Sequence, residues 1–164
     1  MRTSKLHAVL AAVAVVGIAC PGPDDLTAPV TSWDAVLVGA NEVPAVTSPG
    51  VATGTFTLTA AGDSLNYTVT ITTALTGTVT QAHIHTGAIG ANGGIAIWLC
   101  NVSATAPAGT PTCGTTGAAG AFATGKAAIM AAQLNSMRTF GTYANIHSNA
   151  TTATPMIMAE RFMR

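Results

Sequence analysis

The chain has 164 residues, of which 49% are hydrophobic, 7% are charged and 5% are aromatic, and its six basic and six acidic side chains leave a net charge of zero. This length suffices for one globular domain but not for two, because domains usually hold about 100–150 residues. The chain has no cluster of Lys or Arg, so it lacks the basic surface that nucleic-acid binding requires. Its low charge and apolar content also exclude a disordered polypeptide.

The first nineteen residues have the three parts of a signal peptide. Arg2 and Lys5 precede an apolar run at residues 8–19, which ends in a small residue directly before Cys20. As a helix this run would extend only about 18 Å, which is too short to cross a hydrocarbon core of about 30 Å. We therefore predict that residues 1–19 are a signal peptide that is removed during export.

The residues around the expected cleavage point resemble a bacterial lipobox, in which a cysteine is acylated and becomes the new N-terminus. They read Gly-Ile-Ala-Cys at 17–20, and they depart from the usual pattern at Gly17, where Leu is commonest. Several acyl chains on Cys20 would anchor the protein stably to a membrane of the bacterial cell envelope. Residues 20–32, rich in proline, would then form a flexible tether. The alternative is ordinary secretion without a lipid.

Two cysteines remain if Cys20 is lipidated, and exported proteins keep disulfides. Cys100 and Cys113 flank a segment that is rich in Ala, Thr, Gly and Pro and has no apolar pattern of its own. Closing a loop of this length stabilises a protein by about 3 kcal/mol in the chain-entropy model. We predict a disulfide between them, because the spacing does not match the Cys-x-x-Cys pattern of metal or redox sites.

An alternation of apolar and polar residues dominates from residue 33 onward and predicts antiparallel strands with one buried face. In residues 64–72, for example, Leu, Tyr, Val and Ile alternate with Asn and Thr. Threonine suits the outward positions because its branched Cβ packs well on a pleated surface. The pattern predicts eight strands, at residues 33–39, 51–59, 64–72, 78–85, 94–100, 117–124, 142–147 and 156–162.

One helix is expected, at residues 126–137, where apolar residues recur at helical spacing for packing against a sheet. The stripe consists of Ile129, Met130, Gln133, Leu134 and Met137. Many short strands with a single helix predict one all-β domain over residues 33–164. The expected architecture is an antiparallel β-sandwich of Greek-key type, similar to immunoglobulin domains or to superoxide dismutase, with one short helix.

Three histidines remain after removal of the signal peptide, namely His83, His85 and His147, and each lies at the end of a predicted strand. The spacing of His83 and His85 puts both imidazoles on the same face of a strand. Two ligands from one strand and a third from another can form a metal site with an open fourth position. The pattern is compatible with copper or zinc, with Glu42 or water completing the shell. Alternatively, the histidines form structural hydrogen bonds or act without a metal, and Glu42 caps the backbone near Pro44.

The same residues resemble the CHRD domain, which is named from the repeats of chordin. Residues 82–87, Ala-His-Ile-His-Thr-Gly, and the glycine-rich and apolar residues 90–99 are similar to its central signature. Residues 37–44, which end in Glu-Val-Pro, are similar to its opening motif, and residues 143–148, Tyr-Ala-Asn-Ile-His-Ser, to its closing motif. One departure follows the last histidine, where residues 154–161 replace a stretch that usually resembles Gly-Glu-Ile-Arg-Gly.

The resemblance covers about residues 33–163 and implies a secreted or surface domain without a defined general activity. Chordin binds growth factors of the bone morphogenetic class, a role that does not transfer to a bacterial lipoprotein. The sequence does not favour an enzyme, since it lacks a Gly-x-Ser-x-Gly motif and its glycine-rich segment at 87–94 leads into a strand. The first functional prediction is a binding or structural module of the cell envelope with a protein or glycan partner. The alternative is a copper- or zinc-binding protein with redox or hydrolytic activity.

Overall fold

The computed structural model describes residues 29–88, 90–102, 105–114 and 116–149, together with the backbone of residues 156–159. The predicted signal peptide at residues 1–19, Cys20 and most of the expected tether lie outside the described residues. No helix in the described part of the chain is long and apolar enough to cross a membrane.

Each of the eight predicted strands is present, with ends that differ by a few residues from the prediction. In chain order the described elements are β1 (Ser32–Val38), the 3-10 helix η1 (Gly39–Asn41), β2 (Val51–Leu58), β3 (Ser64–Thr73), β4 (Val79–Thr86), β5 (Ile95–Asn101), β6 (Gly120–Ala128), α1 (Ala131–Arg138), β7 (Thr142–Ser148) and β8 (Met156–Ala159). The prediction of an all-β domain with one short helix is confirmed.

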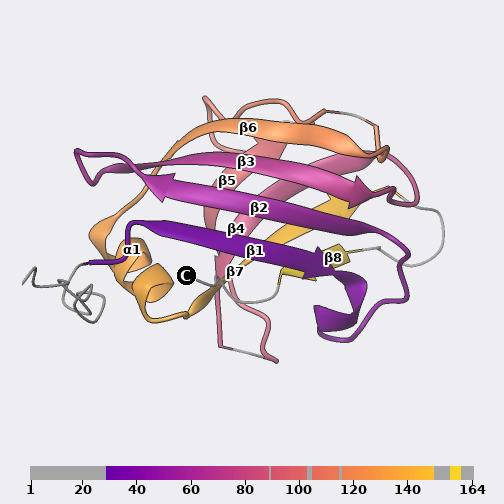
Figure 1. Cartoon of the computed structure of the whole chain (residues 1–164), viewed down its shortest axis with the longest axis horizontal. Helices are drawn as coiled ribbons and strands as arrows, with labels where there is room; N and C mark the ends of the chain where they lie inside the picture. Colours follow the sequence, from indigo (N-terminus) through magenta and orange to yellow (C-terminus); the bar gives the residue numbers. More distant parts are fainter. Residues whose placement is uncertain (1–28, 89, 103–104, 115, 150–155, 160–164) are drawn as a thin grey trace, which may run out of the picture.

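The strands form one antiparallel sheet that folds over into two layers. Their hydrogen-bonded order is β5-β4-β7-β8-β1-β2-β3-β6. One layer holds β1, β2, β3 and β6, and the other holds β4, β5, β7 and β8 (Figure 1). The strands at the two ends of this order, β5 and β6, are also in contact. Thus β4, β5 and β6 follow one another and β7 returns beside β4, which is a Greek-key arrangement. The β-sandwich prediction is confirmed.

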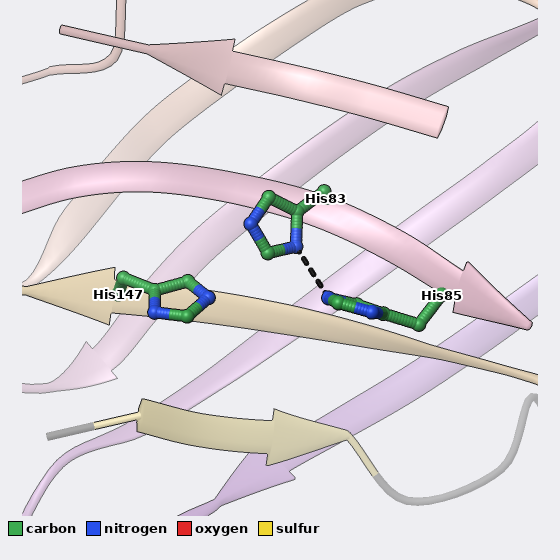
Figure 2. A group of neighbouring side chains, drawn as sticks. All are labelled: His83, His85 and His147. Carbon is green, nitrogen blue, oxygen red and sulfur yellow. Dashed lines mark hydrogen bonds between the residues drawn. The ribbon is translucent and has the colours of Figure 1, made fainter. Parts of the chain in front are cut away.

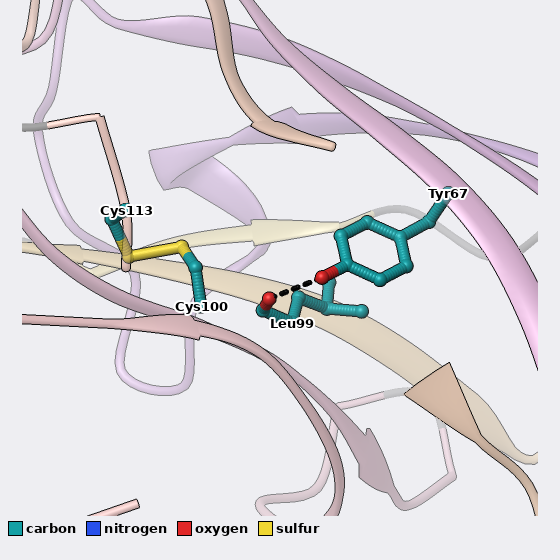
Figure 3. The surroundings of a disulfide bond; sticks show 4 residues. All are labelled: Tyr67, Leu99, Cys100 and Cys113. Carbon is teal, nitrogen blue, oxygen red and sulfur yellow. Dashed lines mark hydrogen bonds between the residues drawn. A yellow bond between two sulfur atoms is a disulfide. The ribbon is translucent and has the colours of Figure 1, made fainter. Parts of the chain in front are cut away.

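The core lies between the layers and follows the alternation in the sequence. On β3 the apolar side chains at every second position are almost fully buried, and the threonines between them point outward. The Tyr67 hydroxyl donates a hydrogen bond to the Leu99 carbonyl oxygen of β5, so that a polar contact joins the layers through the core (Figure 3). The largest fully buried core side chains are Trp33, Leu37, Phe56, Leu65, Ile71, Ile84, Leu99, Met137 and Ile146.

The predicted start of the helix at residue 126 is wrong, since α1 begins at Ala131. Lys126 and Ala127 instead belong to β6, where they pair with Asn66 and Leu65 of β3. Strand pairing therefore outweighs the helical preference of these residues, although Ala and Lys are good helix formers.

The predicted apolar stripe of the helix is only partly used. Leu134 and Met137 are buried, as expected, whereas Met130 precedes the helix and is 66% exposed. Gln133 attaches the helix to the sheet, because its Nε2 donates a hydrogen bond to the carbonyl oxygen of Ala96, 2.6 Å away. The helix thus packs against the sandwich, as the sequence predicts.

The predicted disulfide between Cys100 and Cys113 is present, and both cysteines are buried (Figure 3). It joins the end of β5 to the loop that leads toward β6. The Asn101 backbone N–H donates a hydrogen bond to the Pro111 carbonyl oxygen, 2.9 Å away, which closes the same loop beside the disulfide. The loop is therefore held to the sheet although it contains little apolar surface.

Replacing both cysteines with serine should lower the free energy of unfolding by about 3 kcal/mol. The disulfide joins residues that are 13 positions apart, and closing a loop of this length restricts the unfolded chain. Denaturant unfolding of the oxidised protein and of the Cys100→Ser/Cys113→Ser variant measures the difference. Reductant should destabilise the wild type by a similar amount and leave the double variant unchanged. An unchanged wild-type midpoint in reductant would contradict the prediction.

Candidate metal centre

The three histidines lie on the outer face of the layer that contains β4 and β7. In β4 the side chains of Ala82 and Ile84 belong to the core, so His83 and His85 point to the opposite face, as strand geometry requires. Figure 2 shows both imidazoles on this face with His147 of β7 beside them. The prediction that His83 and His85 share a face is therefore confirmed.

The β4–β7 ladder brings His147 to the other two histidines. His147 pairs with Gln81, and His83 pairs with Asn145, so that His147 is the diagonal neighbour of His83. Residues opposite one another in an antiparallel pair share a face of the sheet. The ladder thus brings His147 into one cluster with His83 and His85, from which it is more than sixty positions away in the sequence.

The imidazole nitrogens are close enough to share one ion. One nitrogen from each of His83, His85 and His147 lies within 4.8 Å of the other two. The Nε2 of His85 lies 2.7 Å from the Nδ1 of His83, and the rings of His83 and His147 have centroids 4.7 Å apart. The Nε2 of His147 is buried and has no hydrogen-bond partner among the described residues. Figure 2 shows the His147 ring directed toward the other two histidines.

A chain of hydrogen bonds determines where the protons of His83 and His85 lie. The carbonyl oxygen of Gly93 can only accept, so the Nδ1 of His85, 2.8 Å away, carries a proton and donates it. The Nε2 of the neutral His85 ring then accepts the hydrogen bond from the Nδ1 of His83. A metal ion bound between these rings would take the place of this hydrogen bond, with the proton of His83 moving from Nδ1 to Nε2. Histidine ligands commonly donate their second N–H to a backbone carbonyl in this way.

All three imidazoles are held in the neutral form, which is the form that binds metals. Burial, together with smaller contributions from the neighbouring His147 and His85, lowers the pKa of His83 to about 3. Burial also lowers the pKa of His147 to about 4, with an additional contribution from His85. The pKa of His85 is lowered by burial as well, although its hydrogen bond to the Gly93 carbonyl opposes that effect. Each ring therefore has one nitrogen lone pair for a metal at neutral pH, which for the Nδ1 of His83 requires the tautomer with the proton on Nε2.

Two aromatic residues next to the histidines were not identified from the sequence. Tyr143 stacks on the His85 ring with a centroid distance of 5.0 Å and an interplanar angle of 2°. Trp98 contacts His83 edge to face at 5.1 Å. Tyr143 stands two and four positions before Asn145 and His147, so the same alternation that marks strand β7 places it on the histidine face. The pairing of Trp98 with His83 depends on strand order, which the sequence does not specify.

Glu42 is not part of the histidine cluster among the described residues. Its side chain is 4% exposed, and neither carboxylate oxygen has a hydrogen-bond partner in the described part of the chain. Burial raises the pKa of Glu42 to about 7. The adjacent residue is tied to the glycine-rich loop, because the Asn92 side chain donates a hydrogen bond to the Val43 carbonyl oxygen at 2.8 Å. The Glu42 carboxylate therefore caps no backbone N–H in the described part of the chain, and its role as a metal ligand stays a prediction.

Comparison with known proteins gives one match. The family model of the CHRD domain matches residues 33–154, which include the three histidines, Glu42 and both disulfide cysteines. No curated protein and no solved structure matches the chain.

Replacing Glu42 with glutamine should stabilise the protein more at pH 8 than at pH 4. The pKa of this carboxyl is raised from 4.5 to about 7, so the folded protein retains a proton there that the unfolded chain has already released. Wild-type stability is therefore lost as the pH rises through this range, whereas a glutamine does not ionise. The difference in unfolding free energy between Glu42→Gln and wild type should grow by up to about 3 kcal/mol.

Chemical denaturation of both proteins across this pH range measures the difference. Asp34→Asn, which removes an exposed carboxylate from β1, is the matched control. A difference between Glu42→Gln and wild type that stays constant with pH would show that the Glu42 carboxyl is not desolvated.

Proposed function

This chain belongs to the CHRD domain family, and we propose that it binds a transition-metal ion through His83, His85 and His147. The observation that carries the proposal is the Nε2 of His147, which is buried beside two other imidazoles without a hydrogen-bond partner in the described part of the chain. An unpaired buried polar atom costs about 1–3 kcal/mol. A metal ion would satisfy this nitrogen and the neighbouring ring nitrogens together.

A purely structural role explains less of the geometry. His83 and His85 do form a hydrogen-bonded chain that ends on the backbone of Gly93, as structural histidines would. The buried Nε2 of His147 adds nothing to that chain. We therefore prefer a metal centre to an envelope binding module that has no metal.

The three imidazole ligands favour some metal ions over others. Imidazole ligands suit zinc, copper, iron and nickel, whereas calcium and magnesium prefer oxygen ligands. Three protein ligands leave a further position for water or a small molecule, as in catalytic metal sites. At such a position copper supports redox chemistry and zinc supports hydrolysis.

We place this centre in the bacterial cell envelope. The basic and apolar residues 1–19 and the lipobox-like residues 17–20 support export and acylation of Cys20. The Cys100–Cys113 disulfide is in keeping with an oxidising compartment. An envelope protein or a glycan is the partner class that this location favours.

Removing one imidazole should abolish tight metal binding without unfolding the protein. The chain purified without a histidine tag should take up about one equivalent of copper or zinc, and His147→Ala should lower the affinity by a factor of about 100 or more. His147→Ala should cost little stability, because the nitrogen it removes makes no hydrogen bond among the described residues. Equilibrium dialysis followed by elemental analysis gives the stoichiometry, and competition with a chelator gives the affinity.

Gln81→Ala is the matched control, since Gln81 lies opposite His147 on the same face and is not one of the three ligands. It should retain the metal, and the His83→Ala/His85→Ala variant should lose it. The metal proposal would be wrong if the wild-type protein could not be loaded with copper or zinc and the histidine variants were merely less stable.

Cys20→Ala should release the protein from the membrane. Because acylation at this position would supply the proposed membrane anchor, the variant should shift from the detergent phase to the aqueous phase in Triton X-114 partitioning. Metabolic labelling with a fatty acid should mark the wild type and not the variant. Equal partitioning and labelling of the two proteins would rule out lipidation at Cys20.

A further inference from the structure

We propose that Tyr143 is a positioning residue that fixes His85 and makes the three-histidine centre selective for Cu(II) over Zn(II). The inference rests on the proposed function, since it concerns which metal the same site prefers. It depends on how His85 is held and on how close its Nε2 lies to the Nδ1 of His83.

Tyr143 restrains His85 in two ways. Its ring lies parallel to the imidazole with a centroid distance of 5.0 Å, which restricts rotation of His85 out of this plane. Its hydroxyl oxygen accepts a hydrogen bond from the Gly93 backbone N–H at 3.0 Å. The carbonyl oxygen of the same Gly93 accepts the hydrogen bond from the Nδ1 of His85 at 2.8 Å. The stacked ring and the Gly93 backbone thus hold both the plane and the direction of the His85 ring.

The glycine-rich loop that completes this arrangement packs closely against the end of β4 and against Tyr143. A Cβ atom on Gly93 would lie 1.4 Å from the Thr86 carbonyl oxygen, so the loop backbone lies directly against the end of β4. A Cβ atom on Gly87 would come within 3.0 Å of the Tyr143 ring. These close approaches allow the Gly93 backbone to contact His85 and Tyr143 together.

The distance between the two ligand nitrogens distinguishes the metals. The Nδ1 of His83 and the Nε2 of His85 are 2.7 Å apart. With metal–nitrogen bonds of about 2.0–2.1 Å, two ligands at a tetrahedral angle lie about 3.3 Å apart, and two ligands at a right angle lie about 2.9 Å apart. Zinc prefers the tetrahedral angle, whereas Cu(II) prefers tetragonal geometry with right angles.

The two metals therefore require different movements of His85. A tetragonal ion needs the nitrogens to separate by about 0.2 Å, and a tetrahedral ion needs about 0.6 Å. Because His85 is held by Tyr143 and Gly93, the larger movement would disturb the stacked ring and the hydrogen bond to the loop. The free energy needed for this larger movement opposes the binding of zinc more than that of Cu(II). The restraint on His85 therefore raises the preference of the site for Cu(II).

The test compares Tyr143→Phe with Tyr67→Phe. The first variant keeps the stacked ring and loses the hydrogen bond to Gly93. The second also removes a buried hydroxyl, but that hydroxyl binds the Leu99 carbonyl oxygen in the core, between the layers. Affinities for Cu(II) and Zn(II) are measured separately by chelator competition on the intact protein, and the electron paramagnetic resonance spectrum of the Cu(II) form reports its geometry.

Tyr143→Phe should raise the affinity for Zn(II) by about tenfold and should change the affinity for Cu(II) less, so that the ratio of Cu(II) to Zn(II) affinity falls. Tyr67→Phe should reduce stability and leave this ratio unchanged. The wild-type Cu(II) spectrum should be tetragonal, a measurement that stands even if Tyr143→Phe fails to fold.

Wild-type protein that binds neither metal would overturn the metal centre itself. Wild-type protein that binds both, with an equal effect of Tyr143→Phe on the two affinities, would overturn only the selectivity. A wild-type Cu(II) spectrum typical of tetrahedral distortion would also overturn the selectivity.

Discussion

The antiparallel pairing of β4 with β7 is the interaction on which both the core and the histidine cluster depend. It sends Ala82 and Ile84 into the core with Ile146, and it leaves His83, His85 and His147 on the opposite face. Side chains alternate between faces with a period of two, so a register slip of one residue would exchange the core and the cluster. The apolar residues that stabilise the fold therefore also set the register of the metal ligands.

The free energy of folding of the sandwich is large enough to tolerate a few buried polar groups without hydrogen bonds. The core and the contact between Tyr67 and Leu99 join the two layers, and the Cys100–Cys113 disulfide holds the loop after β5 to the sheet. The unpaired Nε2 of His147 and the desolvated carboxyl of Glu42 each lower the stability of the folded protein. Local violations of packing rules in natural proteins tend to occur at functional sites.

The electrostatics of the site favour a metal ion bound by neutral ligands. Burial keeps the three imidazoles uncharged, and no acidic side chain joins the cluster among the described residues. Residues 26–125 contain no Lys or Arg, so this part of the chain supplies no positive charge to repel a cation or to steer an anion toward the open position. The binding energy must come from the nitrogen lone pairs and their geometry, which gives the restraint on His85 its importance.

The sequence alone determined the features that depend on local periodicity and spacing. Alternation identified the strands and the shared face of His83 and His85, and the CHRD-like motifs identified His147 as their companion. Features that depend on which strands are neighbours came only from the tertiary structure. These include the strand character of Lys126, the stacking of Tyr143 on His85 and the separation of Glu42 from the cluster. Local patterns constrain a strand's faces, but long-range pairing determines which faces meet.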